Sequence, residues 1–383
     1  MSDLVAECVL APSSPRPLPA GGGRTRAVPR WVHGWAVGTV AAAVALLTLG
    51  ALVTTFRVGM ADPVWPTYPW HLALISWKEP SAGFLIEHAH RLMGFLVGVL
   101  AWWLANFLWA YELRRGLRAF GLITVNGLVA LMMVGHGLRE VRLLGVMFAV
   151  TAGAVALMIA VAGYCREPAV TVRVTATVAL AGVMVQGLFG GFRVKLNELA
   201  GTDLALVHGV FAPVVFAALA AVAQLTSPAW LGPTETAAPA ARRWSLAAVG
   251  LVFGQLLLGA LVRHVNTPLW QRLHLLAAFL VVLAVVCLVR SAWERRDGRR
   301  RLAGPASVLA ALVALQVSLG VEAWMLRFGR GPMADYQPVT VGQAVVRTLH
   351  VLTGAWVLAA AVVLALRANR RPTAAVIQPK EAA

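Results

Sequence analysis

Charged side chains are scarce in this chain. Asp, Glu, Lys and Arg together make up 13% of its 383 residues, whereas hydrophobic residues make up 59%. A soluble domain carries about a quarter charged residues. Several apolar runs reach the roughly 20 residues needed to cross the hydrocarbon core of a bilayer. The composition therefore excludes an ordinary soluble protein and indicates an integral membrane protein, whose first partner is membrane lipid.

Acidic residues are especially few, with 16 Asp and Glu against 33 Lys and Arg, which gives a net charge of +17. Such a charge could suggest nucleic-acid binding. The arginines, however, cluster in short links between apolar runs, most densely between residues 290 and 301. That pattern is typical of cytoplasmic loops under the positive-inside rule. We therefore expect no nucleic-acid partner.

Cysteine is also rare. Cys8, Cys165 and Cys287 share no close spacing, which argues against a cysteine metal site and against a disulfide framework. Residues 1–31 are rich in Pro, Gly and Arg and lack an apolar core. They resemble a disordered cytoplasmic tail more than a signal peptide.

Apolar runs predict ten membrane-spanning helices. An even number places both termini on one side, and that side carries most of the lysine and arginine. We therefore expect a multi-pass protein of the cell inner membrane with both termini in the cytoplasm, residues 368–383 forming a second tail. The predicted helices are 32–56, 85–111, 117–136, 142–164, 172–194, 203–226, 243–263, 270–291, 303–326 and 346–367.

A repeat of helix pairs runs through the chain. The first helix of three pairs carries a Gln-x-x-x-Gly pattern, and the first helix of the earliest pair has Gly50 without a matching glutamine. The second helix of each pair has a histidine near its outer end. The patterns are Gln186/Gly190, Gln255/Gly259 and Gln316/Gly320, and the histidines are His90, His208, His274 and His350.

The two helices at 117–164 break this repeat, because the second has no histidine. We interpret them as an inserted hairpin. The predicted fold is thus an all-α integral membrane protein of two pseudo-symmetric four-helix bundles, at 32–226 and 243–367, plus the hairpin.

The four repeated histidines are candidate cofactor ligands. Ionisable residues at membrane depth are rare and tend to line functional interiors, although interhelical hydrogen bonding is an alternative. A small residue follows each at i+4, which leaves room for a flat macrocycle on the same helix face. Paired imidazoles from facing helices are a common way to hold haem. These residues are Gly94, Ala212, Ala278 and Gly354.

Other metals fit less well. No His-x-x-x-His pattern involves these four histidines, and no cysteine lies beside them. The single carboxylate within a turn is Glu87, three residues before His90 and therefore on its face. Glu87 could serve the site, or it could be a solvated residue favoured by the positive end of the helix dipole. His33 and His264 fall at helix ends, where solvation explains them.

The ordered motifs resemble those of haem A synthases. Gly59-Met-Ala-Asp-Pro-Val-Trp-Pro-Thr67 and Glu87-His-Ala-His-Arg-Leu-Met-Gly94 are similar to the family's first outer loop and second helix. Further matches are 186–193 with His208, 258–264 with His274, and 347–350. The resemblance covers roughly residues 32–112 and 172–367. The chain departs from the family's eight helices by an insertion of about fifty residues, and the segment 57–84 lacks the cysteine pair of some members.

The resemblance implies oxidation of the C8 methyl group of haem O to the formyl group of haem A. His90 and His208 would hold the substrate haem O, and His274 and His350 would hold haem b as cofactor. Glu87 would be the catalytic carboxylate. Arg91, Arg193 and Arg263 lie near outer helix ends and could pair with haem propionates, although snorkelling to the interface explains each equally well.

The family implies two protein partners, a prenyltransferase that makes haem O and a cytochrome c oxidase that receives haem A. A second copy of the chain, in a homo-oligomer, is a further candidate. Two other functions remain open on the residues alone. One is a dihaem cytochrome b that passes electrons from quinol, and the other is a carrier that moves haem unchanged.

Overall fold

A computed structural model describes residues 28–62, 81–138, 141–165, 167–231, 237–294, 302–329 and 338–370. Most of both predicted tails and the motif residues 63–67 lie outside these ranges. Residues 30 and 31, predicted in the tail, belong to the first helix, and residue 368 ends the last. Within the described part, ten helices are long and apolar enough to cross a membrane. The protein is an all-α integral membrane protein, as predicted.

The chain divides into two compact units, Met1–Ser227 and Pro228–Ala383. Nine of the ten long helices begin one to six residues earlier than predicted, α13 begins one residue later, and α9 was not predicted. Unit 1 contains α2 (Arg30–Thr55), α4 (Ala82–Ala110), α5 (Arg115–Leu138), α6 (Val141–Cys165), α7 (Pro168–Lys195) and α8 (Asn197–Thr226). Unit 2 contains α9 (Pro228–Leu231), α10 (Pro239–His264), α11 (Pro268–Trp293), α13 (Gly304–Phe328) and α14 (Val341–Ala368).

Capping residues set the helix starts. The Ser81 hydroxyl accepts a hydrogen bond from the Phe84 amide at the start of α4, and Thr340 with Gln343 forms a capping box at α14. Proline occupies the first turn of α7, α10, α11 and α13, where its missing N–H is not needed. These first turns precede the most apolar runs, so hydropathy alone placed the starts of α4, α7, α10, α11 and α14 too late.

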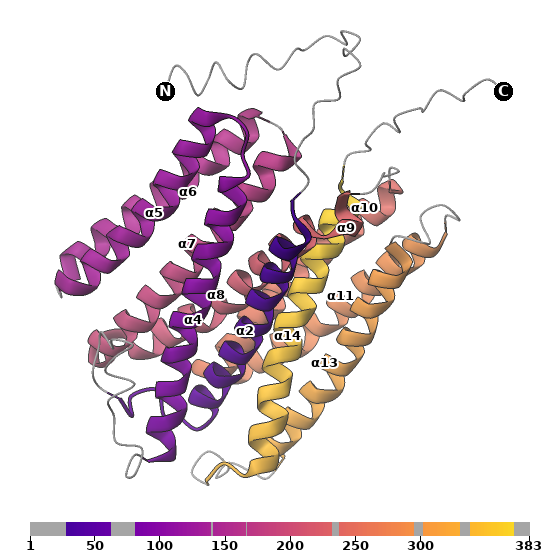
Figure 1. Cartoon of the computed structure of the whole chain (residues 1–383). Coiled ribbons are helices and arrows are strands. Elements are labelled where there is room, and N and C mark those ends of the chain that lie inside the picture. Colours follow the sequence, from indigo (N-terminus) through magenta and orange to yellow (C-terminus); the bar gives the residue numbers. More distant parts are fainter. Residues whose placement is uncertain are drawn as a thin grey trace. The chain divides into compact units, whose positions relative to one another are not determined.

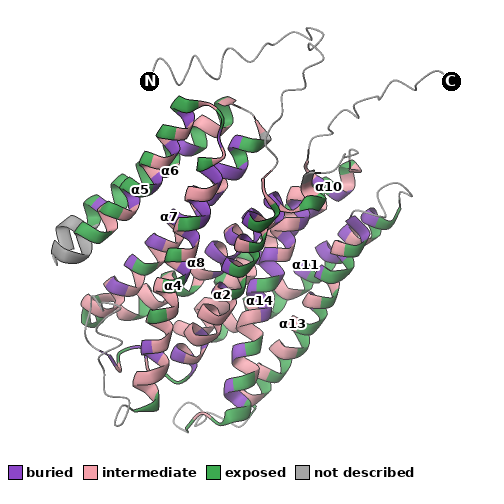
Figure 2. Ribbon diagram, viewed as in Figure 1, coloured by how far each residue is buried: buried purple, intermediate pink, exposed green. Residues whose placement is uncertain are grey.

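Each unit contains a closed ring of four helices. In the first bundle, α2, α4, α7 and α8 pack in that order and α8 returns to α2; in the second bundle, α10, α11, α13 and α14 do the same (Figure 1). Helices α4 and α8 are therefore diagonal to each other, as are α11 and α14. Large apolar residues such as Ile123, Leu276 and Phe279 are exposed, and exposed residues occur along the long helices of both units (Figure 2). In a membrane protein lipid replaces water as the solvent of such side chains.

The first helices of the two bundles end alike. Arg57 has a φ of 57° and Asn266 a φ of 52°, and each lies seven residues after the glycine of its repeat, Gly50 or Gly259. A 6→1 hydrogen bond of the Schellman type is found at each end. At the first end the amide of Val58, the residue after Arg57, donates to the Val53 carbonyl; at the second end the amide of Asn266 itself donates to the Leu261 carbonyl. The internal repeat thus extends to local backbone conformation.

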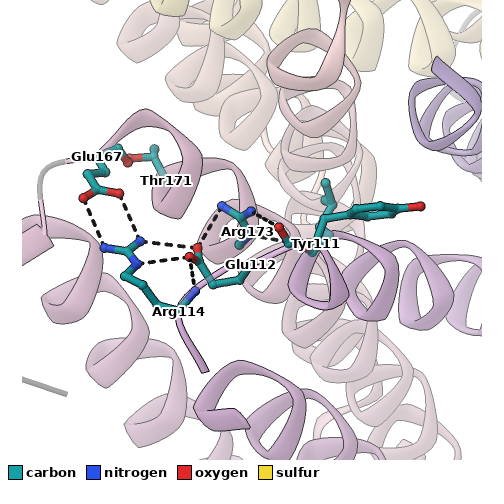
Figure 3. A network of polar contacts seen from close by, with 7 residues as sticks. Tyr111, Glu112, Arg114, Glu167, Thr171 and Arg173 are labelled. Atoms are coloured by element: carbon teal, nitrogen blue, oxygen red, sulfur yellow. Dashed lines mark hydrogen bonds and ion pairs between the residues drawn. The ribbon is translucent and has the colours of Figure 1, made fainter. Parts of the chain in front are cut away.

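The hairpin of α5 and α6 packs on α4 and α7 at the outside of the first bundle. A buried ion-pair network secures its entry (Figure 3). Arg173 of α7 contacts Glu112 at 3.1 Å, and Arg114 contacts both Glu112 and Glu167 at 3.0 Å. Burial alone would raise the pKa of Glu112, but the hydrogen bond from Arg114 and the charge of Arg173 hold that pKa below its ordinary value.

Candidate functional site

Each of the four predicted ligand histidines packs its ring against a glycine of the preceding long helix of its bundle. A Cβ built on the glycine would meet Cε1 of the ring in every case. At Gly50, Gly259 and Gly320 a side chain would push on the imidazole, whereas at Gly190 the contact would be an ordinary one. The distances from such a Cβ to Cε1 are 2.9 Å for Gly50 and His90, 3.5 Å for Gly190 and His208, 3.1 Å for Gly259 and His274, and 3.0 Å for Gly320 and His350.

The histidines meet in pairs inside the bundles. His90 of α4 and His208 of α8 have ring centroids 6.5 Å apart and ring planes at 81°. Because α4 and α8 are diagonal, this contact crosses the interior of the first bundle. His274 and His350 belong to the diagonal helices of the second bundle and are close enough to interact electrostatically. The structure therefore brings together the two pairs that the sequence repeat indicated.

Three glutamines of the repeat hold the histidine helices. Gln186 Nε2 donates to the backbone carbonyl of His208 at 2.9 Å, and Gln255 Nε2 donates to that of His274 at 2.8 Å. Gln316 Nε2 lies 3.4 Å from His350 Nε2. The sequence pattern identified these glutamines, but not their contacts.

His90 is held differently, because Leu46 occupies the position of the missing glutamine. The Nδ1 atom of His90 lies 3.2 Å from the Leu46 carbonyl oxygen. When Nδ1 carries the proton and donates it there, the Nε2 lone pair is left for a metal. The backbone of the repeat glutamine acts in the same way on the rings of His208, His274 and His350, but in the described part of the chain their buried Nδ1 atoms make no hydrogen bond of ordinary geometry.

Glu87 is buried, with 4% of its surface exposed. Its Oε1 accepts from Arg91 Nη2 at 2.8 Å, and its Oε2 accepts from the Asp62 backbone amide at 2.8 Å. The interpretation of Glu87 as a solvated residue at a helix start is therefore wrong. The carboxylate is instead desolvated one turn from His90 and charge-compensated by Arg91.

Asp62 and His88 extend this cluster, and sequence reasoning missed both. Asp62 Oδ2 lies 3.2 Å from Arg91 Nη1 and 3.5 Å from His88 Nδ1, and both residues are buried. His88 also stacks on Phe84. The sequence did place Asp62 in the motif of residues 59–67. Its contact with α4, however, follows only from the fold, which brings the segment after α2 against that helix.

The three candidate arginines have different surroundings. Arg91 is engaged with Glu87 and Asp62. Arg193 lies against the backbone of Gly59, where a Cβ would be 2.6 Å from both terminal guanidinium nitrogens. Its charge acts on Glu87, His90 and His208, and its Nε is buried without a hydrogen-bond partner among the described residues.

Arg263 belongs to a cationic cluster in unit 2. The charges of Arg327 and Arg347 act on it, and its own charge acts on His350. Sequence reasoning missed Arg327 and Arg347, although Arg347 lies three residues before His350 as Glu87 lies before His90. Concentrated positive charge beside a histidine pair suits an anionic group such as a carboxylate.

The first histidine pair fits a metal held between two imidazoles. A metal–imidazole bond is about 2 Å long, and with each ring's own radius the two centroids lie roughly 6 Å apart, close to the distance found for His90 and His208. Among the described residues, no group of three or more His, Cys, Asp or Glu is arranged to hold a metal ion. Each site therefore provides two imidazole ligands for a metal ion, with arginine guanidinium groups nearby. Comparisons with protein-family models, with curated proteins and with solved structures found no match for this chain.

Proposed function

We propose that this protein is a haem A synthase, which oxidises the C8 methyl group of haem O to the formyl group of haem A. The observation that carries the proposal is the pair of imidazoles packed against glycine in each bundle. Among the described residues, a buried carboxylate lies beside the first pair and none lies beside the second. Glu87 precedes His90 by three residues, whereas Gln271 and Arg347 stand at the same spacing before His274 and His350. One bundle is thus equipped for chemistry and the other for holding a cofactor.

In this proposal the first bundle binds the substrate haem O through His90 and His208, and the second binds haem b through His274 and His350. When bound, the haem groups supply the redox chemistry that oxidises the methyl carbon. The glycines admit the imidazoles to the interior, and the Gln186 and Gln255 amides fix the backbone of His208 and His274. The protein contributes position and a water-poor interior.

Glu87 acts as the proton acceptor for the methyl group. Oxidation of a C–H bond releases a proton, which a positioned carboxylate can take up. In the resting site Arg91 and the Asp62 amide each donate a hydrogen bond to one carboxylate oxygen of Glu87. A weakening of either bond as charge develops on the substrate would free an oxygen atom of Glu87 to receive the proton.

Arginines near the histidines bind the haem propionates. Arg193 has an unused buried Nε in the first bundle, and Arg263 lies with Arg327 and Arg347 in the second. Arg91 is a weaker candidate, because its guanidinium already contacts two carboxylates. Planar guanidinium groups can bind carboxylates through two parallel hydrogen bonds.

The same proposal assigns the cellular setting. The positive-inside pattern favours the cell inner membrane with both termini in the cytoplasm. A prenyltransferase would supply haem O and a cytochrome c oxidase would take up haem A.

Mass analysis of extracted haem tests the function. The full chain is co-expressed with a haem O source, purified in detergent, and its haem groups are extracted. We expect haem b together with haem O or haem A. Haem b alone, in two copies, would favour a dihaem cytochrome b, and a preparation without haem would contradict any haem function.

A further inference from the structure

We infer that the two ligands of the first bundle are unequal, with His90 the fixed ligand of the substrate iron and His208 the ligand that detaches. This inference rests on the proposed function. A substrate haem must enter and leave its site, so one of its axial bonds must open readily. Three independent features of the structure assign that opening to His208.

The first feature is how tightly each ring is seated. A Cβ on Gly50 would have three atoms of the His90 ring within 4 Å, the nearest at 2.9 Å. A Cβ on Gly190 would have only Cε1 of His208 within that distance, at 3.5 Å, which is an ordinary contact. The ring of His208 is therefore less closely confined by its glycine than the ring of His90.

The second feature is the other ring nitrogen. His90 Nδ1 is held by the Leu46 carbonyl at 3.2 Å. The backbone carbonyl of Gln186, at the equivalent position, also acts on the His208 ring, but within the described ranges the buried His208 Nδ1 makes no hydrogen bond of ordinary geometry. A hydrogen bond from Nδ1 fixes the ring and strengthens it as a metal ligand, and loss of such a partner typically costs about 10- to 100-fold in metal affinity. His90 is thus the stronger ligand of the pair.

The third feature is the helix that carries each residue. α8 has a non-helical residue, Ala200 (φ −148°, ψ 25°), before His208, and Pro213 after it. Pro213 has no N–H for the carbonyl of Gly209, the residue next to His208. No proline and no break of this kind occurs in α4, which is described throughout. The backbone around His208 is therefore easier to shift than that around His90.

The second bundle provides an internal comparison. The glycine distances there are 3.1 Å and 3.0 Å, with three ring atoms within 4 Å in both cases, and α11 and α14 are uninterrupted over their described lengths. Like His208, His274 and His350 have a buried Nδ1 that makes no hydrogen bond of ordinary geometry to a described residue. The Nδ1 hydrogen bond therefore distinguishes only His90 from His208, within the first bundle. Closely confined histidines on uninterrupted helices suit a haem that remains bound. One less confined histidine ligand suits a haem that is exchanged.

A matched pair of substitutions tests the inference. The full chain, co-expressed with a haem O source, is compared as wild type, His90→Ala and His208→Ala. Readouts are haem O and haem b per chain and the spectrum of the reduced protein with carbon monoxide, which binds iron only where an axial position is open. We expect His208→Ala to keep haem O in a five-coordinate, carbon monoxide-binding form. His90→Ala should lose haem O, and the low-spin haem b spectrum shows whether each variant is folded.

Pro213→Ala provides a test that keeps both ligands. Restoring the N–H should stiffen α8 and slow carbon monoxide binding to the reduced first site by about tenfold or more. Pro239→Ala, at the first turn of α10 where the N–H is not needed, should leave the rate unchanged. Equal loss of haem O from both histidine variants, selective loss from His208→Ala, or an unchanged rate in Pro213→Ala would each overturn the inference while leaving the proposed function intact. Absence of haem from the wild-type chain would overturn both.

Discussion

Both oxygen atoms of Glu87 accept hydrogen bonds, one from Arg91 and one from the Asp62 amide. A glutamine would keep the shape and retain a bond to the Asp62 amide, but it would lose the charge and the ability to accept a proton. We therefore expect Glu87→Gln to bind both haem groups and to lose about a hundredfold or more in the rate of haem A formation. Mass analysis of the haem products measures this.

The matched control for Glu87 is Glu112→Gln, which changes another buried carboxylate of unit 1 away from the histidines. It should lower stability without stopping haem A formation in the folded fraction. Normal haem A output from Glu87→Gln at equal expression would mean that this carboxylate is structural.

The glycine seats can be tested without touching a ligand. An alanine at Gly259 would place its Cβ 3.1 Å from His274 Cε1, whereas an alanine at Gly254 on the same helix would meet nothing within 4 Å. Overpacking of this kind typically costs about 1–3 kcal/mol. We expect Gly259→Ala to weaken the low-spin haem b spectrum and Gly254→Ala to leave it unchanged. A normal spectrum in Gly259→Ala would show that the ring can move without losing the iron.

At the scale of the elements, the ion-pair network at Glu112 should make the entry to the hairpin sensitive to pH. The folded-state pKa of Glu112 lies below its ordinary value of 4.5. The stabilisation of the folded protein by ionised Glu112 is therefore fully present above that pH and is lost as the pH falls through the folded-state pKa. Glu112→Gln should cost about 3 kcal/mol near neutral pH, because it removes one partner of buried Arg173.

Thermal unfolding in detergent at a series of pH values measures this effect. The difference between wild type and Glu112→Gln should shrink as the pH falls below 4.5. Glu294→Gln is the control, since its pair with Arg290 is exposed and should contribute little at any pH. A difference that stays constant down to low pH would show that Glu112 does not stabilise as a charged group.

Hydropathy and repeat spacing predicted the elements better than their ends or their irregularities. The ten helices and the shared placement of the four histidines follow from long apolar runs and a fixed pattern, which local sequence contains. The break at Ala200 and the contact of Asp62 with Arg91 depend on tertiary packing and were not predicted. His33 was expected to be solvated, but its Nδ1 lies 3.2 Å from Thr226 Oγ1, a residue far along the chain. The two bundles could therefore be predicted from the sequence, whereas the cluster of Asp62 with Arg91 could not.

At the scale of the whole molecule, membrane topology provides a further prediction. Reporter fusions after residues 166, 235 and 298 should report the cytoplasm, and fusions near 68, 198 and 335 the opposite side. The reason is that an even number of membrane-spanning helices separates the members of each set, and arginine concentrates in the first set of links. Opposite results at 68 and 198 would mean that α5 and α6 do not both cross the membrane. His90 and His208 would then no longer share a depth.

The seating of each imidazole has a consequence for biogenesis. Every glycine–histidine contact lies within one helical hairpin, formed by α2 with α4, α7 with α8, α10 with α11, or α13 with α14. Each contact can therefore form as soon as its hairpin has left the ribosome and entered the bilayer. The two imidazoles of a pair always come from different hairpins. Iron could therefore bind between two imidazoles only after both of their hairpins have formed. Its binding would link two hairpins that had folded separately during translation.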